Sequence, residues 1–169
     1  PYHHYYYPGT VPLSPMTFVG MIIDVVKATA LAGYNKWILL NTHGQEWLLP
    51  LAVQKLGLEG YFVIAPTLWE LVREELSDIL ETYFVHAGEA ETSLALAIVP
   101  ELVKIDKAID EERDHLLDNK WFSVPSKGAP IFAFAGTFYS PEYKQLKHGV
   151  IGFPTKATPE KGEKIINAV

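Results

Sequence analysis

Apolar residues recur along the chain with two spacings that predict alternating helices and strands. Helical spacing begins after Ser14, a hydroxyl cap followed by proline, and Gly33 ends that segment. Continuous apolar runs at 36–41 and 61–65 are typical of buried parallel strands. The segment 46–57, which lies between these two runs, predicts a helix that would connect them.

The second half of the chain continues the pattern. It predicts a helix over 68–76, a third strand over 83–85 and a helix over 90–99. Residues 121–156 are rich in glycine, proline and aromatic residues and predict an irregular segment, after which Thr158 caps a last helix. This order indicates an α/β fold with a mainly parallel sheet and helices on both faces. We expect a single domain over residues 1–169.

Composition excludes several functional classes. The 169-residue chain has a net charge of −6 and no basic cluster, so a nucleic-acid surface is not expected. It has no cysteine, which removes thiolate nucleophiles, disulfides and cysteine-based zinc sites and fits a cytoplasmic location. No apolar run reaches the length of a membrane span, so we expect no membrane partner.

Two loops that follow predicted strands carry side chains that can bind a metal ion or transfer a proton. The loop 41–46 contains His43, and the loop 86–91 contains His86 and Glu91. Parallel strands end at one edge of a sheet, so we expect His43 and Glu91 to face one cavity. Histidine with carboxylate suits a divalent cation such as zinc or manganese. Water bound to such a cation ionises near neutral pH, and a nearby imidazole can move protons.

Each of these residues also has a purely structural interpretation. His43 could be a loop histidine bonded to the backbone. Glu89 and Glu91 would stabilise a first helical turn by about 0.3–1 kcal/mol without any function. Trp69 could cover a pocket or belong to the core. The aromatic opening around His4 could line a pocket or lie between subunits.

Four segments of the sequence match motifs of a known family. They are "YPGT" at 7–10, "LLNTHGQE" at 39–46, "HAGEAETS" at 86–93 with "PELV" at 100–103, and "ATPEKGEKI" at 157–165. In these segments the chain resembles the creatininase (creatinine amidohydrolase) family. The resemblance implies a three-layer α/β/α sandwich and a metal-dependent hydrolase of cyclic or linear amides or related carbonyl compounds. It also implies two divalent metal ions, zinc or manganese, a metal-bound hydroxide, a small-molecule substrate and a homo-oligomer, a hexamer in relatives.

The resemblance assigns roles to individual residues. His43 matches a ligand of one metal ion and Glu91 a ligand of the other. His86 matches the catalytic histidine that handles protons at the scissile bond. The residues that match positions at or near the substrate pocket are His4, Trp69, Gln45 and Glu89.

The sequence departs from creatininase proper at the first loop. Gln45 stands where creatininase has a glutamate near the metal, and Gly44 replaces a tyrosine. The creatinine pocket is therefore not reproduced. The loop and the tyrosine-rich opening resemble relatives from cyclitol breakdown, in which a cyclic diketone is hydrolysed at a carbon–carbon bond.

A larger departure concerns the metal ligands. In the family, a segment ahead of the PGT turn supplies further ligands through a Glu-x-His-Gly…Asp pattern, and this pattern does not occur in the sequence. We therefore expect the domain to be incomplete at its N-terminus, either as a fragment of an intact, active parent protein or as one of two polypeptides that form the enzyme. The alternative is a non-catalytic creatininase-like module for binding or assembly.

Overall fold

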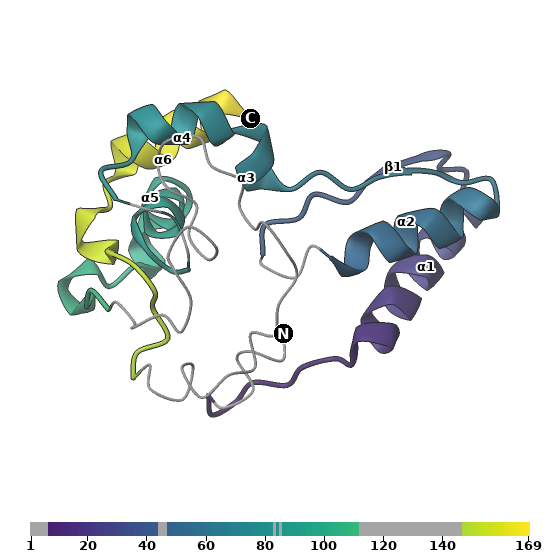
Figure 1. Ribbon diagram of the computed structural model, residues 1–169, viewed down its shortest axis with the longest axis horizontal. Helices are drawn as coiled ribbons and strands as arrows, with labels where there is room; N and C mark the ends of the chain where they lie inside the picture. The colour runs from purple at the N-terminus through teal and green to yellow at the C-terminus, as the bar shows by residue number, and fades with distance from the viewer. Residues whose placement is uncertain (1–6, 44–46, 83, 85, 112–146) are drawn as a thin grey trace, which may run out of the picture. The chain divides into compact units, whose positions relative to one another are not determined.

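The computed structural model describes residues 7–43, 47–82, 84, 86–111 and 147–169. The chain forms two compact units, Pro1–Leu71 and Val72–Val169. The α-helices and β1 are labelled in Figure 1. The first unit contains α1 (Pro15–Leu31), β1 (Lys36–Ile38), α2 (Leu48–Leu58), β2 (Phe62–Ile64) and α3 (Leu68–Leu71). The second contains α4 (Arg73–Ile79), α5 (Glu89–Ile98), the 3-10 turns η2 (Pro100–Leu102), η3 (Ile105–Lys107) and η5 (Pro154–Lys156), and α6 (Pro159–Ala168).

Both predicted helix caps are confirmed. The Ser14 side chain accepts a hydrogen bond from the Thr17 amide at 3.2 Å, and proline occupies the first position of α1. The Thr158 side chain accepts from the Lys161 amide at 3.3 Å at the start of α6. These caps satisfy amides that a helix cannot pair internally, which is why the local sequence located both starts correctly.

The two predicted strands pair in parallel, as expected for a β-α-β unit. β1 and β2 are three residues each, with Trp37 opposite Val63, and α2 connects them. The pairing continues beyond the strands through a parallel bridge between Asn41 and Thr67. The prediction that both runs are fully buried is wrong for one face, because Ile38 is 70% exposed.

The other face of the strand pair packs on the core of the first unit. Val26 of α1, Leu56 of α2 and Val63 of β2 are buried together. Trp37 packs against them and its indole Nε1 donates to the Thr29 hydroxyl at 2.9 Å. The partly buried indole N–H therefore has a hydrogen-bond partner, and the bond between Trp37 and Thr29 connects β1 to α1.

A close crossing of α5 and α6 organises the second unit (Figure 1). A Cβ atom placed on Gly162 would lie only 2.1 Å from the Ser93 carbonyl oxygen. The two helix backbones therefore approach as closely as they do because position 162 has no side chain. The Ser93 hydroxyl adds a bond by accepting from the Thr158 amide at 3.1 Å.

One local prediction needs correction, and another stays a prediction. The helix expected over 68–76 breaks at Val72, whose backbone (φ −113°, ψ 20°) leaves the helical region and separates α3 from α4. Of the third strand expected at 83–85, only Phe84 lies within the described residues, where it forms a β-bridge, so this strand stays a prediction. The neighbouring His86 forms an antiparallel bridge with Ile151.

The fold class is therefore supported at a coarser level than the sequence predicted. The described residues contain one parallel sheet of two strands and are otherwise mostly helical. The three-layer arrangement and the single domain over 1–169 stay predictions. Among the same described residues, no helix is long and apolar enough to cross a membrane.

Replacing Gly162 with alanine tests the helix crossing. We expect Gly162→Ala to lower the free energy of unfolding by about 1–3 kcal/mol, because the added methyl group forces α6 away from Ser93. Gly20→Ala is the control, since nothing lies within 4 Å of its Cβ, and should raise stability by about 0.5–1 kcal/mol. Urea denaturation measures both changes, and equal midpoints for the two variants would contradict this account.

Candidate functional site

The His43 loop is fixed by the asparagine that ends the β1 segment. Asn41 continues the parallel ladder, with its amide donating to the Pro66 carbonyl at 2.9 Å. Its side-chain Nδ2 donates to the His43 carbonyl at 2.8 Å, and the His43 amide lies 3.4 Å from Oδ1. These bonds make a local turn of the kind that asparagine favours, and they hold His43 at the carboxyl end of β1.

The environment of His43 favours a neutral imidazole. The residue is half-buried, and burial lowers the pKa of His43 below its usual value of 6.5. A neutral imidazole is the form that binds a metal ion. Trp69 of α3 follows β2 at the same end of the strand pair and is only 5% exposed.

The His86 loop of the second unit is held by a two-way backbone bridge. The His86 amide donates to the Ile151 carbonyl at 3.1 Å, and the Ile151 amide donates back at 2.9 Å. Next along the chain, a Cβ on Gly88 would lie 3.3 Å from the Phe153 amide nitrogen, so the two backbones nearly touch. Between them, Ala87 adopts φ +49°, a conformation that non-glycine residues seldom take.

His86 and Glu91 lie close to each other on this loop. His86 Nδ1 is 3.9 Å from Glu91 Oε2, and the two side chains are 28% and 25% exposed. The Ala87 amide donates to Glu91 Oε2. Burial raises the pKa of Glu91 to about 7, and the Ala87 hydrogen bond acts in the opposite direction. The loop thus presents an imidazole and a partly buried carboxylate to one small space.

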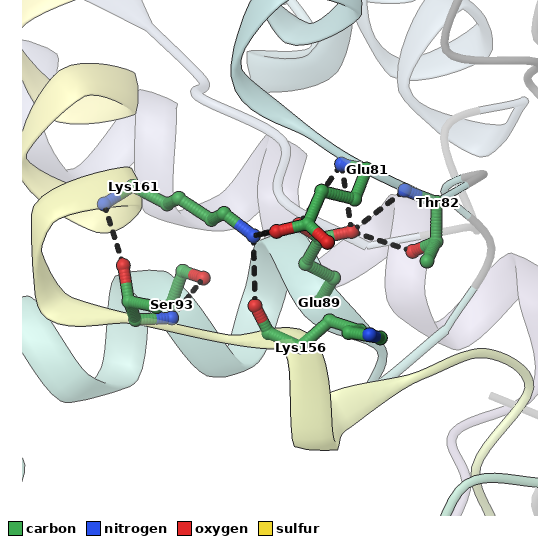
Figure 2. A network of polar contacts seen from close by, with 7 residues as sticks. Glu81, Thr82, Glu89, Ser93, Lys156 and Lys161 are labelled. Carbon is green, nitrogen blue, oxygen red and sulfur yellow. Dashed lines mark hydrogen bonds and ion pairs between the residues drawn. The ribbon is translucent and has the colours of Figure 1, made fainter.

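Glu89 belongs to a separate polar network (Figure 2). It is 1% exposed, and its oxygens accept from the Glu81 amide, the Thr82 amide and hydroxyl, and Lys161 Nζ. Burial raises the pKa of Glu89, but the bonds from Lys161 and Thr82 outweigh it and leave the pKa below its usual value. These contacts favour a structural role for Glu89 over the predicted contact with substrate.

The donor chemistry fits a divalent cation, but the number of donors falls short in the part of the chain that the structure describes. No group of three His, Cys, Asp or Glu residues occurs there in a metal-binding arrangement. His43 belongs to the first unit, and Glu91 belongs to the second. Their convergence on one cavity therefore stays a prediction.

The remaining predicted site residues fall outside the description, and two residues were missed. His4 and Gln45 lie outside the described residues. Asn41 lies in a matched motif but received no role, although the Asn-x-His spacing itself suits a side chain that bonds two residues ahead. Lys161 was overlooked because no local pattern links it to Glu89, which is 72 positions away.

A pocket of about 390 Å³ lies beside the His86 loop within the second unit. Its lining includes Ala87 and Thr92 from the loop and α5. Lys104, Lys107 and His148 add positive or titratable groups to its wall. Ala87 lies directly after His86, so the pocket adjoins the loop on which the candidate proton carrier lies.

Comparison with known proteins identifies the family. The sequence model of the creatininase family, described as creatinine amidohydrolase, matches residues 1–169. The chain therefore belongs to the creatininase family.

Individual relatives support this assignment. The chain is 31% identical to 3-dehydro-scyllo-inosose hydrolase of Thermotoga maritima over 183 aligned residues, which cover 100% of this chain and 58% of that protein. It is 28% identical to creatinine amidohydrolase of Pseudomonas putida over 120 residues, or 62% of this chain and 46% of the relative. The chain thus spans less than two thirds of either relative.

Solved structures show that the fold is creatininase-like. A mutant creatininase of the Zn–Zn type matches with a TM-score of 0.70 at 24% identity, over 96% of this chain and 63% of that structure. At this level of identity the match establishes the fold, and the chemistry has to be argued from the residues.

Proposed function

We propose that the protein is a divalent-metal-dependent hydrolase that acts on a cyclic or linear amide or a related carbonyl compound. The observation that carries this proposal is the pair formed by His86 and Glu91, 3.9 Å apart on a loop whose backbone is locked by Ile151. An imidazole beside a carboxylate is what proton transfer and cation binding both require. Membership of the creatininase family supports the same reading.

This chain would contribute His43 and Glu91 as ligands of two divalent ions, zinc or manganese. The solved creatininase of the Zn–Zn type supports the choice of zinc. When bound, such ions act as Lewis acids that activate water and polarise the substrate carbonyl. The ligands that this chain's described residues do not supply would come from elsewhere in the intact protein.

His86 would carry the proton at the scissile bond. The backbone bonds between His86 and Ile151 fix the main chain from which the imidazole ring extends. The side chain is 28% exposed, which leaves it accessible to a substrate. The ring nitrogen would deliver a proton to the leaving group and so avoid an unstable anion. Three residues would contact the substrate: Trp69, His4 and Gln45. Glu89 would hold the start of α5, next to the His86 loop, in position.

A cyclic diketone cleaved at a carbon–carbon bond is the second candidate substrate. The observation in its favour is that the match to 3-dehydro-scyllo-inosose hydrolase covers the whole chain, whereas the match to creatinine amidohydrolase covers 62% of it. Gln45, which stands at a glutamate position of creatininase proper, points the same way. We further propose that the protein works in the cytoplasm as a homo-oligomer, a hexamer as in relatives.

Metal analysis of the purified native protein tests the ligand assignment. We expect bound zinc or manganese, and a fall in metal content in His43→Ala and Glu91→Ala, because each change removes a ligand. His148→Ala is the matched control, since His148 also lies beside a glutamate (3.7 Å from Glu111) but outside the family motifs. A native protein without any divalent ion would favour the non-catalytic binding or assembly module.

Replacing His86 separates proton transfer from metal binding. We expect His86→Gln to lower kcat by about 10²–10⁴-fold while metal content stays unchanged, because the imidazole moves protons and is not a ligand. Steady-state kinetics and metal analysis of the same preparation measure the two quantities. Loss of metal together with activity would show that His86 is a ligand and that this role is wrong.

A substrate comparison distinguishes the two candidate reactions. Incubating the native protein with 3-dehydro-scyllo-inosose and with creatinine should give turnover of the cyclitol derivative and little of creatinine, because Gln45 and Gly44 do not reproduce the creatinine site. Product detection by mass spectrometry reads out both reactions. Preferential hydrolysis of creatinine would overturn the ranking.

A further inference from the structure

The Lys161 ammonium group is the centre of the network in Figure 2. Its Nζ lies 2.5 Å from Glu89 Oε1, 2.6 Å from Glu81 Oε1 and 2.9 Å from the Lys156 carbonyl oxygen. Because an ammonium group has three protons, these three acceptors use its whole donor capacity. The side chain is 14% exposed, so water competes little for the same protons.

The partner of Lys161 is a carboxylate that could not be buried alone. Glu89 is 1% exposed. Burying a charged group costs on the order of several kcal/mol unless the group is paired and hydrogen-bonded. Thr82 supplies two further bonds, from its amide at 2.8 Å and from its hydroxyl at 2.6 Å. The network therefore joins α6, the first residue of α5 and the segment that follows α4.

Glu89 belongs to the same helical turn as Glu91. Two residues along a helix are separated by about 3 Å along the axis, so a shift of the first residue of α5 moves both. Glu91 in turn accepts from the Ala87 amide and lies beside His86. The loop is thus anchored at one end by the His86–Ile151 bridge and at the other by the bonds of Glu89.

The position of Lys161 is itself fixed by the helix crossing. Gly162, the next residue, allows α6 to touch the Ser93 carbonyl, and Thr158 caps α6 while its amide donates to the Ser93 hydroxyl. Lys161 therefore approaches Glu89 from a helix that has little freedom to slide. Through the contact between Lys161 and Glu89, α6 supports the start of α5.

We propose that Lys161 is a positioning residue that acts through Glu89 to hold Glu91 and His86 in the geometry that the site requires. Glu89 is then a positioning group as well. The inference rests on the proposed hydrolase function for its catalytic consequence, but its structural consequence is independent of that function.

The test compares Lys161→Met with Lys161→Arg in the native protein. Lys161→Met keeps an unbranched side chain of similar length but leaves Glu89 buried without its cation. We expect zinc affinity to fall by on the order of 10-fold, at the low end of the loss seen when a group that directly orients a metal ligand is removed. Lys161→Arg keeps the charge and should recover most of the affinity. Lys27→Met is the matched control, because Lys27 makes an exposed 2.6 Å ion pair with Glu59 in the first unit.

Hydrogen exchange of the Ala87 amide provides a readout that does not depend on metal or activity. This amide donates to Glu91, so it should exchange faster in Lys161→Met and stay protected in Lys161→Arg and Lys27→Met. If Lys161→Met fails to fold, Thr82→Val serves instead, since it removes only the hydroxyl bond to Glu89 and should increase exchange to a lesser degree.

The outcomes separate the two ideas. A native protein that binds zinc, with Lys161→Met or its substitute retaining both zinc affinity and Ala87 protection, would overturn the positioning role and leave the proposed function standing. A native protein without zinc, in which Lys161→Met still accelerates Ala87 exchange, would support the positioning role and refute the proposed function.

Discussion

The second unit depends on the neutralisation of one buried carboxylate. Glu89 lies at the start of α5 with 1% of its surface exposed, and four groups from two other segments bind it. Carboxylates near a helix N-terminus are favourable by the helix dipole, but that effect is small beside the cost of burial. The direct bonds from Lys161 and Thr82 are what make the buried position possible. They add to the close approach of Gly162 to Ser93 and to the Ser93–Thr158 bond, which also hold α5 against α6.

In the first unit, hydrogen bonds between uncharged groups hold the candidate loop and the strand beside it. Asn41 bonds both the amide and the carbonyl of His43, and Trp37 bonds Thr29. Hydrogen bonds from side chains to the backbone do not require a charge to be removed from water. The His43 loop can therefore be held in place although the adjacent face of the sheet is exposed. The candidate residues of both units therefore sit on loops that the surrounding elements hold in a fixed conformation.

Local signals in the sequence predicted the elements better than the contacts between them. Ser14 and Thr158 were found because a cap needs only its own helix, and the parallel pairing of 36–41 with 61–65 followed from the run of apolar residues. The break at Val72 was missed because no glycine or proline marks it. Glu89 and Glu91 look alike in sequence, and the bonds from residues 81 and 82 and from Lys161, 72 positions away, distinguish the buried Glu89. The convergence of His43 and Glu91 stays a prediction for the same reason, since it depends on long-range packing.

Backbone strain lies beside His86, the residue proposed to carry the proton. Among the described residues, Ala87 is the one non-glycine residue with positive φ, at +49°. Such a conformation costs on the order of 1–3 kcal/mol and persists only where surrounding contacts enforce it. Here the enforcing contacts are the His86–Ile151 bridge on one side and the Glu89 network on the other. A loop held in this way suits the proposed role, because a proton carrier needs its ring at a fixed distance from the reacting atoms.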